Sequence, residues 1–333
     1  MITIPVFLIR FKKLLINRLT AYRDSTLRHF KFFLMDYANA IEYLEDLMPT
    51  SYSPGLERFA AFADYYDNPQ NVNYKCIHVA GTNGKGSVVA IVEECLRRGN
   101  VKSARYTGPH LLNWTERIQV GGLEISRDEF ARVLLNTKTK SDNFASLYSN
   151  FGRLSWFELI TAMAFFYFQE TAVETAVFEV GLGGRWDATN VISSPVVTAI
   201  VTVSLDHTHI LGDSISAIAS EKAEIIKANV PVVTACSGEA LTVIRRVSKV
   251  RNAPLITLDE MGNLAAGTDS RDEKDLLEKL KSRYAELQGR DGIPIKSILS
   301  GQSGYQKTNA AVAAAILGIY EILSEKQVLE HFA

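Results

Sequence analysis

Cysteine and net charge are both scarce in this sequence, and each scarcity excludes a class of protein. The 333 residues include three cysteines, Cys76, Cys95 and Cys236, whose spacing fits neither a metal site nor a redox motif. We interpret them as buried thiols of a reducing compartment. The formal net charge is only −1, so the composition gives no electrostatic reason to expect a nucleic acid as a partner.

A long apolar run is also missing. The longest one in the body of the chain, residues 156–168, contains Glu158 and is shorter than the roughly 20 residues that a membrane-spanning helix needs. The sequence therefore predicts a core helix there, and no transmembrane segment. Hydrophobic residues make up 47% of the chain, which is enough to build one large or two ordinary domains.

The first 34 residues differ from the rest because they carry seven Lys or Arg residues and a single acid, Asp24. Three interpretations are open: a basic transit or membrane-surface segment, an extra helix packed on the body, or sequence upstream of a functional start at Met35. The third is favoured because residues 35–47 have the pattern of a fresh amphipathic helix. We expect a cytoplasmic protein, with organelle targeting by the basic segment left open.

Apolar strands and helical stretches alternate along the remaining chain. The predicted strands are residues 75–81, 175–180, 195–205, 230–235 and 254–258. The predicted helices are residues 86–99, 156–168, 214–228, 238–251 and 305–323. Residues 100–125 read as loop-rich, and residues 259–296 as a charged stretch with little site chemistry. Repeated strand–helix units predict an α/β fold with a mostly parallel sheet flanked by helices, which binds ligands at the carboxyl ends of its strands.

A glycine-rich loop, residues 81–87 with the sequence GTNGKGS, directly follows the first predicted strand. The general phosphate-loop pattern fails, because valine stands where its first glycine belongs and the hydroxyl residue, Ser87, comes one place late. The strand–loop–helix context nevertheless favours a nucleotide site, since backbone N–H groups and the helix dipole face a bound anion. Lys85 would neutralise phosphate charge, and Ser87 could reach a Mg²⁺ ion.

Acidic and histidine residues follow two later strands of the predicted sheet. Glu179 stands at the end of one strand, and Asp206, His207 and His209 follow the next. A single acidic or histidine residue at the end of a strand is more often structural than functional. Two consecutive strand ends beside a phosphate loop favour a metal site instead, because hard cations prefer oxygen ligands. Histidine is an unusual ligand for Mg²⁺.

Taken together, these motifs resemble the Mur ligase superfamily, and within it the dihydrofolate synthase/folylpolyglutamate synthase family. The segments that carry the resemblance are HVAGTNGKGS, TGPHLLNWTERIQVGG, LSWFELITAMAFF, FEVGLGGRWDATN, VSLDHTHILG and SEKAEIIK, spread over roughly residues 76–235. The late hydroxyl of the loop is typical of the superfamily. The resemblance implies a P-loop-containing α/β domain like the Mur ligase central domain, spanning residues 35–325.

The implied activity is that of an ATP-dependent ligase that forms carbon–nitrogen bonds. Such a ligase joins L-glutamate to dihydropteroate, to a folate, or to both, through an acyl phosphate, and it is a monomer. Carried over residue by residue, the resemblance implies catalytic roles for Lys85, Lys222 and His207. It implies Mg²⁺ ligands at Ser87, Glu179 and His207, and a second Mg²⁺ ion beside Lys222 if that lysine is carbamylated.

The resemblance also implies two binding regions. The nucleotide would be bound by Thr82, Asn83, Gly84, Lys85, Gly86, Ser87 and Asn309, the last of which would face the adenine. The pteroate would be bound by Ser155, Phe157 and Asp187. Without the resemblance, the sequence gives no reason to choose Lys222 over Lys227.

Several features depart from the family pattern. Gly108 stands where serine is usual, Tyr305 where histidine is common, and Glu224 where glycine is usual, which puts an acid near Lys222. The resemblance implies a smaller C-terminal Rossmann-like domain after the predicted helix at 305–323, and we expect this chain to lack it. A non-catalytic or split-gene remnant that binds a nucleotide or a pterin therefore stays open as the alternative. A cell-wall Mur ligase is less favoured, because too few residues precede the phosphate loop, and a general P-loop kinase or GTPase fails the strict motif.

Overall fold

The computed structural model describes residues 35–48, 55–71, 73–259, 262–267, 271–289 and 304–324. The basic segment 1–34 lies outside these residues, so its three interpretations remain untested. The helix predicted to follow Met35 is present as α2, Tyr37–Leu47, which begins after the N-cap Asp36.

A nine-stranded sheet with the order β4-β3-β2-β5-β1-β6-β7-β8-β9 forms the centre of the described part. Its strands are β1 Lys75–Ala80, β2 Ser103–Tyr106, β3 Ile118–Val120, β4 Leu123–Glu124, β5 Thr175–Glu179, β6 Val197–Ile200, β7 Val232–Thr234, β8 Leu255–Leu258 and β9 Leu264–Ala266. The six strands from β2 to β8 in this order are parallel, whereas β3, β4 and β9 pair antiparallel at the two edges. The predicted α/β fold with a mostly parallel sheet is confirmed.

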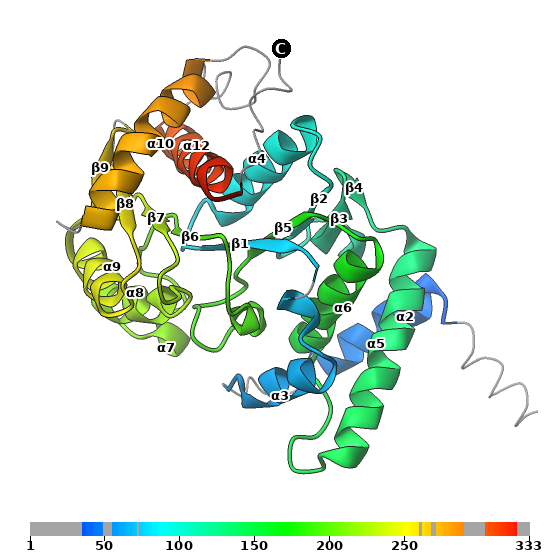
Figure 1. Ribbon diagram of the computed structural model, residues 1–333. Helices are drawn as coiled ribbons and strands as arrows, with labels where there is room; N and C mark the ends of the chain where they lie inside the picture. Colours follow the sequence, from blue (N-terminus) through cyan, green and yellow to red (C-terminus); the bar gives the residue numbers. More distant parts are fainter. Residues whose placement is uncertain are drawn as a thin grey trace, which may run out of the picture.

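Helices cover both faces of this sheet (Figure 1). Their bounds are α3 Glu57–Tyr65, α4 Lys85–Arg98, α5 Arg127–Leu147, α6 Trp156–Glu170, α7 Thr208–Leu211, α8 Ile215–Ala223, α9 Gly238–Val250, α10 Arg271–Gly289 and α12 Gly304–Ser324, with short 3₁₀ turns at Pro69–Asn71, Trp114–Arg117 and Ala188–Val191. In Figure 1, α4, α10 and α12 lie over one face, and the other helices lie on the opposite side. Among the described residues, no helix combines the length and apolarity that crossing a bilayer requires.

The two faces of the sheet are packed with different side chains. On the side of α12, the buried residues of that helix include a run of small ones from Ala310 to Ala315, and the helix packs against α4. On the side of α6, large rings such as Phe59, Phe165 and Phe178 fill the core. Small side chains let helices approach closely, whereas large rings fill a wider gap. Cys76, Cys95 and Cys236 are buried and free, as the sequence predicted.

Three segments differ from their predicted structure. Residues 100–125 contain β2, β3 and β4, which are too short to show a clear alternating pattern. The strand predicted at 195–205 is regular only at Val197–Ile200, because Thr202 then bonds to the phosphate loop instead of to a neighbouring strand. The helix predicted at 214–228 ends at Ala223.

Candidate functional site

The loop of residues 81–87 leaves the carboxyl end of β1 and leads directly into α4. Gly84 is the N-cap of α4 and has φ +85°. Residues that carry a Cβ rarely adopt this backbone conformation. A Cβ on Gly84 would also lie 2.3 Å from Oδ1 of Asn309, which is buried on α12. The loop conformation therefore depends on glycine at this position, and Asn309 lies directly against the loop.

The segment after β6 holds the backbone of this loop. The Thr82 N–H donates to the carbonyl of Thr202 over 2.7 Å, and the Thr202 hydroxyl donates to the carbonyl of Asn83 over 3.1 Å. The Ser204 N–H donates to the Thr82 hydroxyl over 3.1 Å. The first N–H groups of α4 have no acceptors within the helix, and the positive end of the helix dipole lies there. A preformed loop with free N–H groups suits a phosphate.

Glu179, at the end of β5, brings a buried carboxylate to the loop. Its Oε1 lies 3.8 Å from Nζ of Lys85, its Oε2 accepts from the N–H of Gly108 over 3.2 Å, and Gly86 lies against it. Burial raises the pKa of Glu179, and the charge of Lys85 opposes that rise. Burial therefore disfavours the ionised form of Glu179 more than Lys85 favours it, and a bound cation would stabilise that ionised form.

The structure distinguishes the two lysines that the sequence could not. Lys222 is 5% exposed, and its Nζ donates to the carbonyl of Gly81 in the phosphate loop over 3.1 Å. Burial, followed by the charge of Lys85, lowers its pKa to about 8. Lys227 instead donates to the carbonyl and side-chain oxygens of Asn190, which does not belong to the phosphate loop.

The glycine-rich loop of residues 181–190 carries Asp187, which is buried. One carboxylate oxygen of Asp187 accepts from the N–H groups of Gly181 and Leu182 over 2.8 and 2.9 Å. The other accepts from Thr189, whose hydroxyl also meets Nε2 of buried His78 at 2.8 Å. The carboxylate therefore fixes the loop, and burial raises its pKa.

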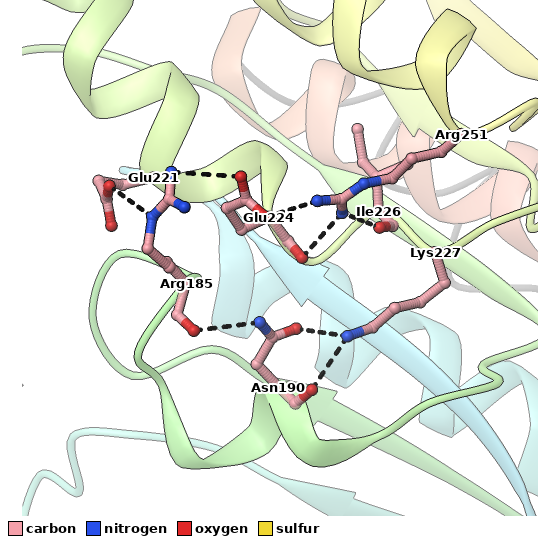
Figure 2. Close-up of polar contacts among 7 residues, drawn as sticks. All are labelled: Arg185, Asn190, Glu221, Glu224, Ile226, Lys227 and Arg251. Atoms are coloured by element: carbon pink, nitrogen blue, oxygen red, sulfur yellow. Dashed lines mark hydrogen bonds and ion pairs between the residues drawn. The ribbon is translucent and has the colours of Figure 1, made fainter. Parts of the chain in front are cut away.

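A polar network ties this loop to α8, the helix of Lys222 (Figure 2). Arg185 donates to Glu221 over 2.9 Å and pairs with Glu224 at 3.2 Å. Glu224 also pairs with Arg251. Two arginines therefore hold the Glu224 carboxylate, and Glu224 is not among the charges that shift the pKa of Lys222. The loop also needs glycine at 184, where a Cβ would lie 2.6 Å from the carbonyl oxygen of Glu221.

A cavity of about 580 Å³ opens beside the phosphate loop and brings together several predicted site residues. Its lining includes Ser155, Phe157, Glu179 and His207. Ser155 caps α6, and its hydroxyl donates to Glu158 over 2.8 Å, so that hydroxyl already has a structural role. Asp187 holds the cavity wall through the loop described above.

The three predicted metal ligands are placed unequally. Glu179 is buried, whereas Ser87 in the first turn of α4 and His207 after β6 are exposed. His207 has φ +46°, and its ring lies 3.7 Å from the Asp206 carboxylate. Within the described ranges, no group of three His, Cys, Asp or Glu side chains could by itself hold a metal ion. The donor set fits a hard cation only if phosphate oxygens or water complete it.

Arg117, which the sequence reasoning did not single out, also lines the cavity, and it is 7% exposed. Its guanidinium lies 5.1 Å from the ring centre of Trp114 and 5.6 Å from that of Trp156. In the sequence, Arg117 is one cation within residues 100–125, whose pattern predicts loops. Burial of an arginine cannot be read from that position alone.

The geometry defines an α/β domain with a glycine-rich loop of the kind that binds phosphates at the carboxyl edge of its sheet, and with a cavity beside that loop. No model of a protein family matches the chain. A dihydrofolate synthase/folylpolyglutamate synthase from Bacillus subtilis is 37% identical over 226 residues, which cover 67% of this chain and 52% of that protein.

Two solved structures are also similar. A folylpolyglutamate synthase from Thermotoga maritima is 31% identical with a TM-score of 0.67, and the match covers 89% of this chain and 65% of that one. FolC of E. coli in complex with DHPP and ADP is 30% identical with a TM-score of 0.59, over 67% of this chain and 51% of that one. This chain spans about half the length of the curated relatives that it matches. It is a relative of the dihydrofolate synthase/folylpolyglutamate synthases, as the motifs predicted.

Proposed function

We propose that this chain uses ATP to activate a carboxylate and joins the activated group to the amine of L-glutamate. The carboxylate would belong to dihydropteroate, to a folate, or to both. The observation that carries the proposal is the junction of a preformed phosphate loop with a cavity of about 580 Å³, with Glu179 at that junction. The names of the relatives support this reaction. The ADP and DHPP bound to one similar structure support a nucleotide and a second, acceptor-side ligand.

On the nucleotide side, the proposal assigns the phosphates to the backbone and side chains of Thr82, Asn83, Gly84, Lys85, Gly86 and Ser87. Lys85 would neutralise the charge that develops on the transferred phosphoryl group. The contact of Asn309 with the loop supports a place beside the nucleotide, and its contact with the adenine remains a prediction.

The proposed Mg²⁺ ligands are Ser87, Glu179 and His207. A bound Mg²⁺ ion would supply neutralisation of phosphate charge. The lowered pKa of Lys222 supports its carbamylation, because only a neutral amine adds CO₂, forming an N–C bond and releasing a proton. The carbamate would then be an anion near the carbonyl of Gly81, suited to a second cation.

The proposed reaction has two steps. A carboxylate oxygen of the acceptor attacks the γ-phosphorus, and the bond to the β–γ bridging oxygen breaks as ADP leaves. The glutamate amine then attacks the acyl carbon, loses a proton, and phosphate leaves. Lys85, Lys222 and His207 are the proposed catalytic residues, and Ser155, Phe157 and Asp187 hold or shape the acceptor side.

The test measures ADP release from ATP and Mg²⁺ with dihydropteroate or a folate as acceptor, together with mass spectrometry of the acceptor product. We expect acceptor-stimulated ADP release and, with L-glutamate, an acceptor extended by one glutamate. If the chain binds an ATP analogue but neither acceptor, the proposal fails and a nucleotide-binding remnant is supported. A cytoplasmic location, a monomeric state and a domain spanning residues 35–325 remain predictions.

A further inference from the structure

Three arginines line the cavity, and they differ in their partners. Arg58 pairs with Glu158 at 2.7 Å, and Arg153 pairs with Asp142 at 2.7 Å. Arg117 is the most buried of the three, yet no carboxylate lies within ion-pair distance of it in the part of the chain that the structure describes. A buried cation without an anion is costly, so this one calls for an explanation.

The groups in direct contact with the Arg117 guanidinium are neutral, and the carboxylates of Glu179 and Glu116 act on its charge only from beyond ion-pair distance. Its Nε donates to Nδ1 of His110 over 2.8 Å, and burial and the charge of Arg117 lower the pKa of that histidine. The rings of Trp114 and Trp156 contact the guanidinium and recover part of the lost hydration by cation–π attraction. These contacts hold the group in place and leave its positive charge unpaired.

The adjacent acid, Glu116, bonds to the backbone of its own segment and makes no ion pair with Arg117. Its carboxylate accepts the backbone N–H groups of Leu111, Leu112 and Asn113 over 2.6–2.7 Å. These bonds lower the pKa of Glu116, so the carboxylate is already satisfied as an anion. The segment of residues 111–117 is therefore folded so that Glu116 bonds to its backbone, whereas Arg117 lines the cavity.

The guanidinium lies toward the phosphate-loop end of the cavity. A Cβ on Gly108 would lie 2.8 Å from a terminal nitrogen of Arg117, and the N–H of the same Gly108 donates to Glu179. Glu179 in turn faces Lys85. Apolar and aromatic side chains, among them Leu154 and Phe157, line another part of the wall. The cavity therefore has a charged end beside the phosphate loop, where Arg117 and Glu179 lie, and an apolar stretch of wall next to the paired Arg58 and Arg153.

We propose that Arg117 is the binding residue for the carboxylate of the acceptor, which it holds beside the phosphate loop while the aromatic body of the acceptor lies along the apolar wall. This inference rests on the proposed function and deepens it, because it orients the acceptor in the cavity. A planar guanidinium can bind a carboxylate through two parallel hydrogen bonds. The ligand class is an aromatic carboxylic acid, and the bound anion supplies the ion-pair partner that the described residues do not provide.

The experiment compares dihydropteroate with its neutral carboxamide analogue. Affinities for both are measured by calorimetry in the presence of Mg²⁺ and a non-hydrolysable ATP analogue. We expect the wild-type chain to prefer the acid, and Arg117→Met to weaken acid binding about 10- to 100-fold while leaving carboxamide binding nearly unchanged. Arg117→Lys should restore part of the preference. Arg132→Met, at a partly exposed arginine paired with Glu129 and Glu170, is the matched control and should behave as wild type.

Two results would overturn the inference alone. Equal weakening of acid and carboxamide by Arg117→Met would mean that Arg117 only supports the cavity wall. If the Arg117→Met variant fails to bind the ATP analogue because it does not fold, the wild-type chain decides. In that case equal wild-type affinities for the acid and the carboxamide would overturn the inference. A wild-type chain that binds the ATP analogue but neither acceptor ligand would instead overturn the proposed function, and the inference with it.

Discussion

The two ends of the candidate site are built in different ways. The phosphate-loop end consists of consecutive residues 81–87 between one strand and one helix, and most of its hydrogen bonds go to the short segment of residues 202–204. The cavity end collects side chains from segments as distant as Leu56, Arg117, Phe157 and His207. The first end depends on local conformation, which a short motif can encode. The second depends on the packing of the whole fold.

This difference predicts separable effects of substitution. Changes in the loop should affect the nucleotide, and changes in the cavity should affect the acceptor. Glu179 is the point where the two ends meet, since it contacts Lys85 on one side and Gly108 on the other.

The largest effect is expected from Gly84→Ala. The new Cβ would meet Asn309 and force an unfavourable φ, so we expect a loss of about 2–3 kcal/mol in the free energy of unfolding and loss of nucleotide binding. Gly152→Ala is the matched control, because Gly152 has φ +71° and nothing within 4 Å of a new Cβ. It should cost about 1–2 kcal/mol and leave nucleotide binding intact. Equal losses in denaturant melts would mean that the contact with Asn309 does not matter.

The substitution Lys85→Met tests most clearly whether nucleotide binding and acceptor binding can be changed independently. Removal of this charge should weaken binding of an ATP analogue by about 1.5–3 kcal/mol and leave the affinity for the acceptor nearly unchanged. Lys138→Met, on the distant α5 where Lys138 pairs with Asp142, serves as the control. A comparable loss of acceptor affinity in Lys85→Met would show that the two ends are not separable.

Lys222 should form a carbamate, and Lys227 should not. The pKa of each is lowered to about 8, so both amines are partly neutral near that pH. Only Lys222 lies beside the phosphate loop, where a carbamate could pair with a cation. With isotopically labelled bicarbonate, NMR should show one carbamate signal in the wild-type chain and in Lys227→Met, but none in Lys222→Met. A signal that survives Lys222→Met would refute this assignment.

The effect at His78, which is linked to the loop of residues 181–190 through a hydrogen bond with Thr189, appears only on acidification. Burial lowers its pKa to about 3, from the usual 6.5. The unfolded chain therefore binds more protons between these values, and His78 makes the folded state less stable as the pH falls below 6.5. The loss should approach about 1.4 kcal/mol per pH unit. In urea melts, His78→Gln should show a shallower loss on acidification than wild type, and identical slopes would contradict this account.

Sequence reasoning located the loop end of the site because its signal is local. A strand, a glycine-rich turn and a helix follow one another, and the structure has β1, the loop and α4 in that order. It also placed Glu179 correctly at the end of β5, since that position follows from strand order.

The cavity end could not be predicted in the same way. Burial of Arg117 depends on Trp114 and Trp156, which reach it from different elements. The carboxylate of Glu224 is paired with Arg185 and Arg251, whose approach only the folded chain reveals. Strands of two to four residues, such as β3 and β4, leave too short a pattern to recognise.

The most direct test of the central claim follows oxygen atoms from acceptor to phosphate. The acceptor carboxylate is labelled with heavy oxygen, and the inorganic phosphate formed in the presence of ATP, Mg²⁺ and L-glutamate is examined by phosphorus NMR or mass spectrometry. If the site phosphorylates the carboxylate, each phosphate released with amide formation carries one heavy oxygen. Phosphate without the label, formed at the same rate with or without acceptor, would show that water attacks ATP and that the site does not activate a carboxylate.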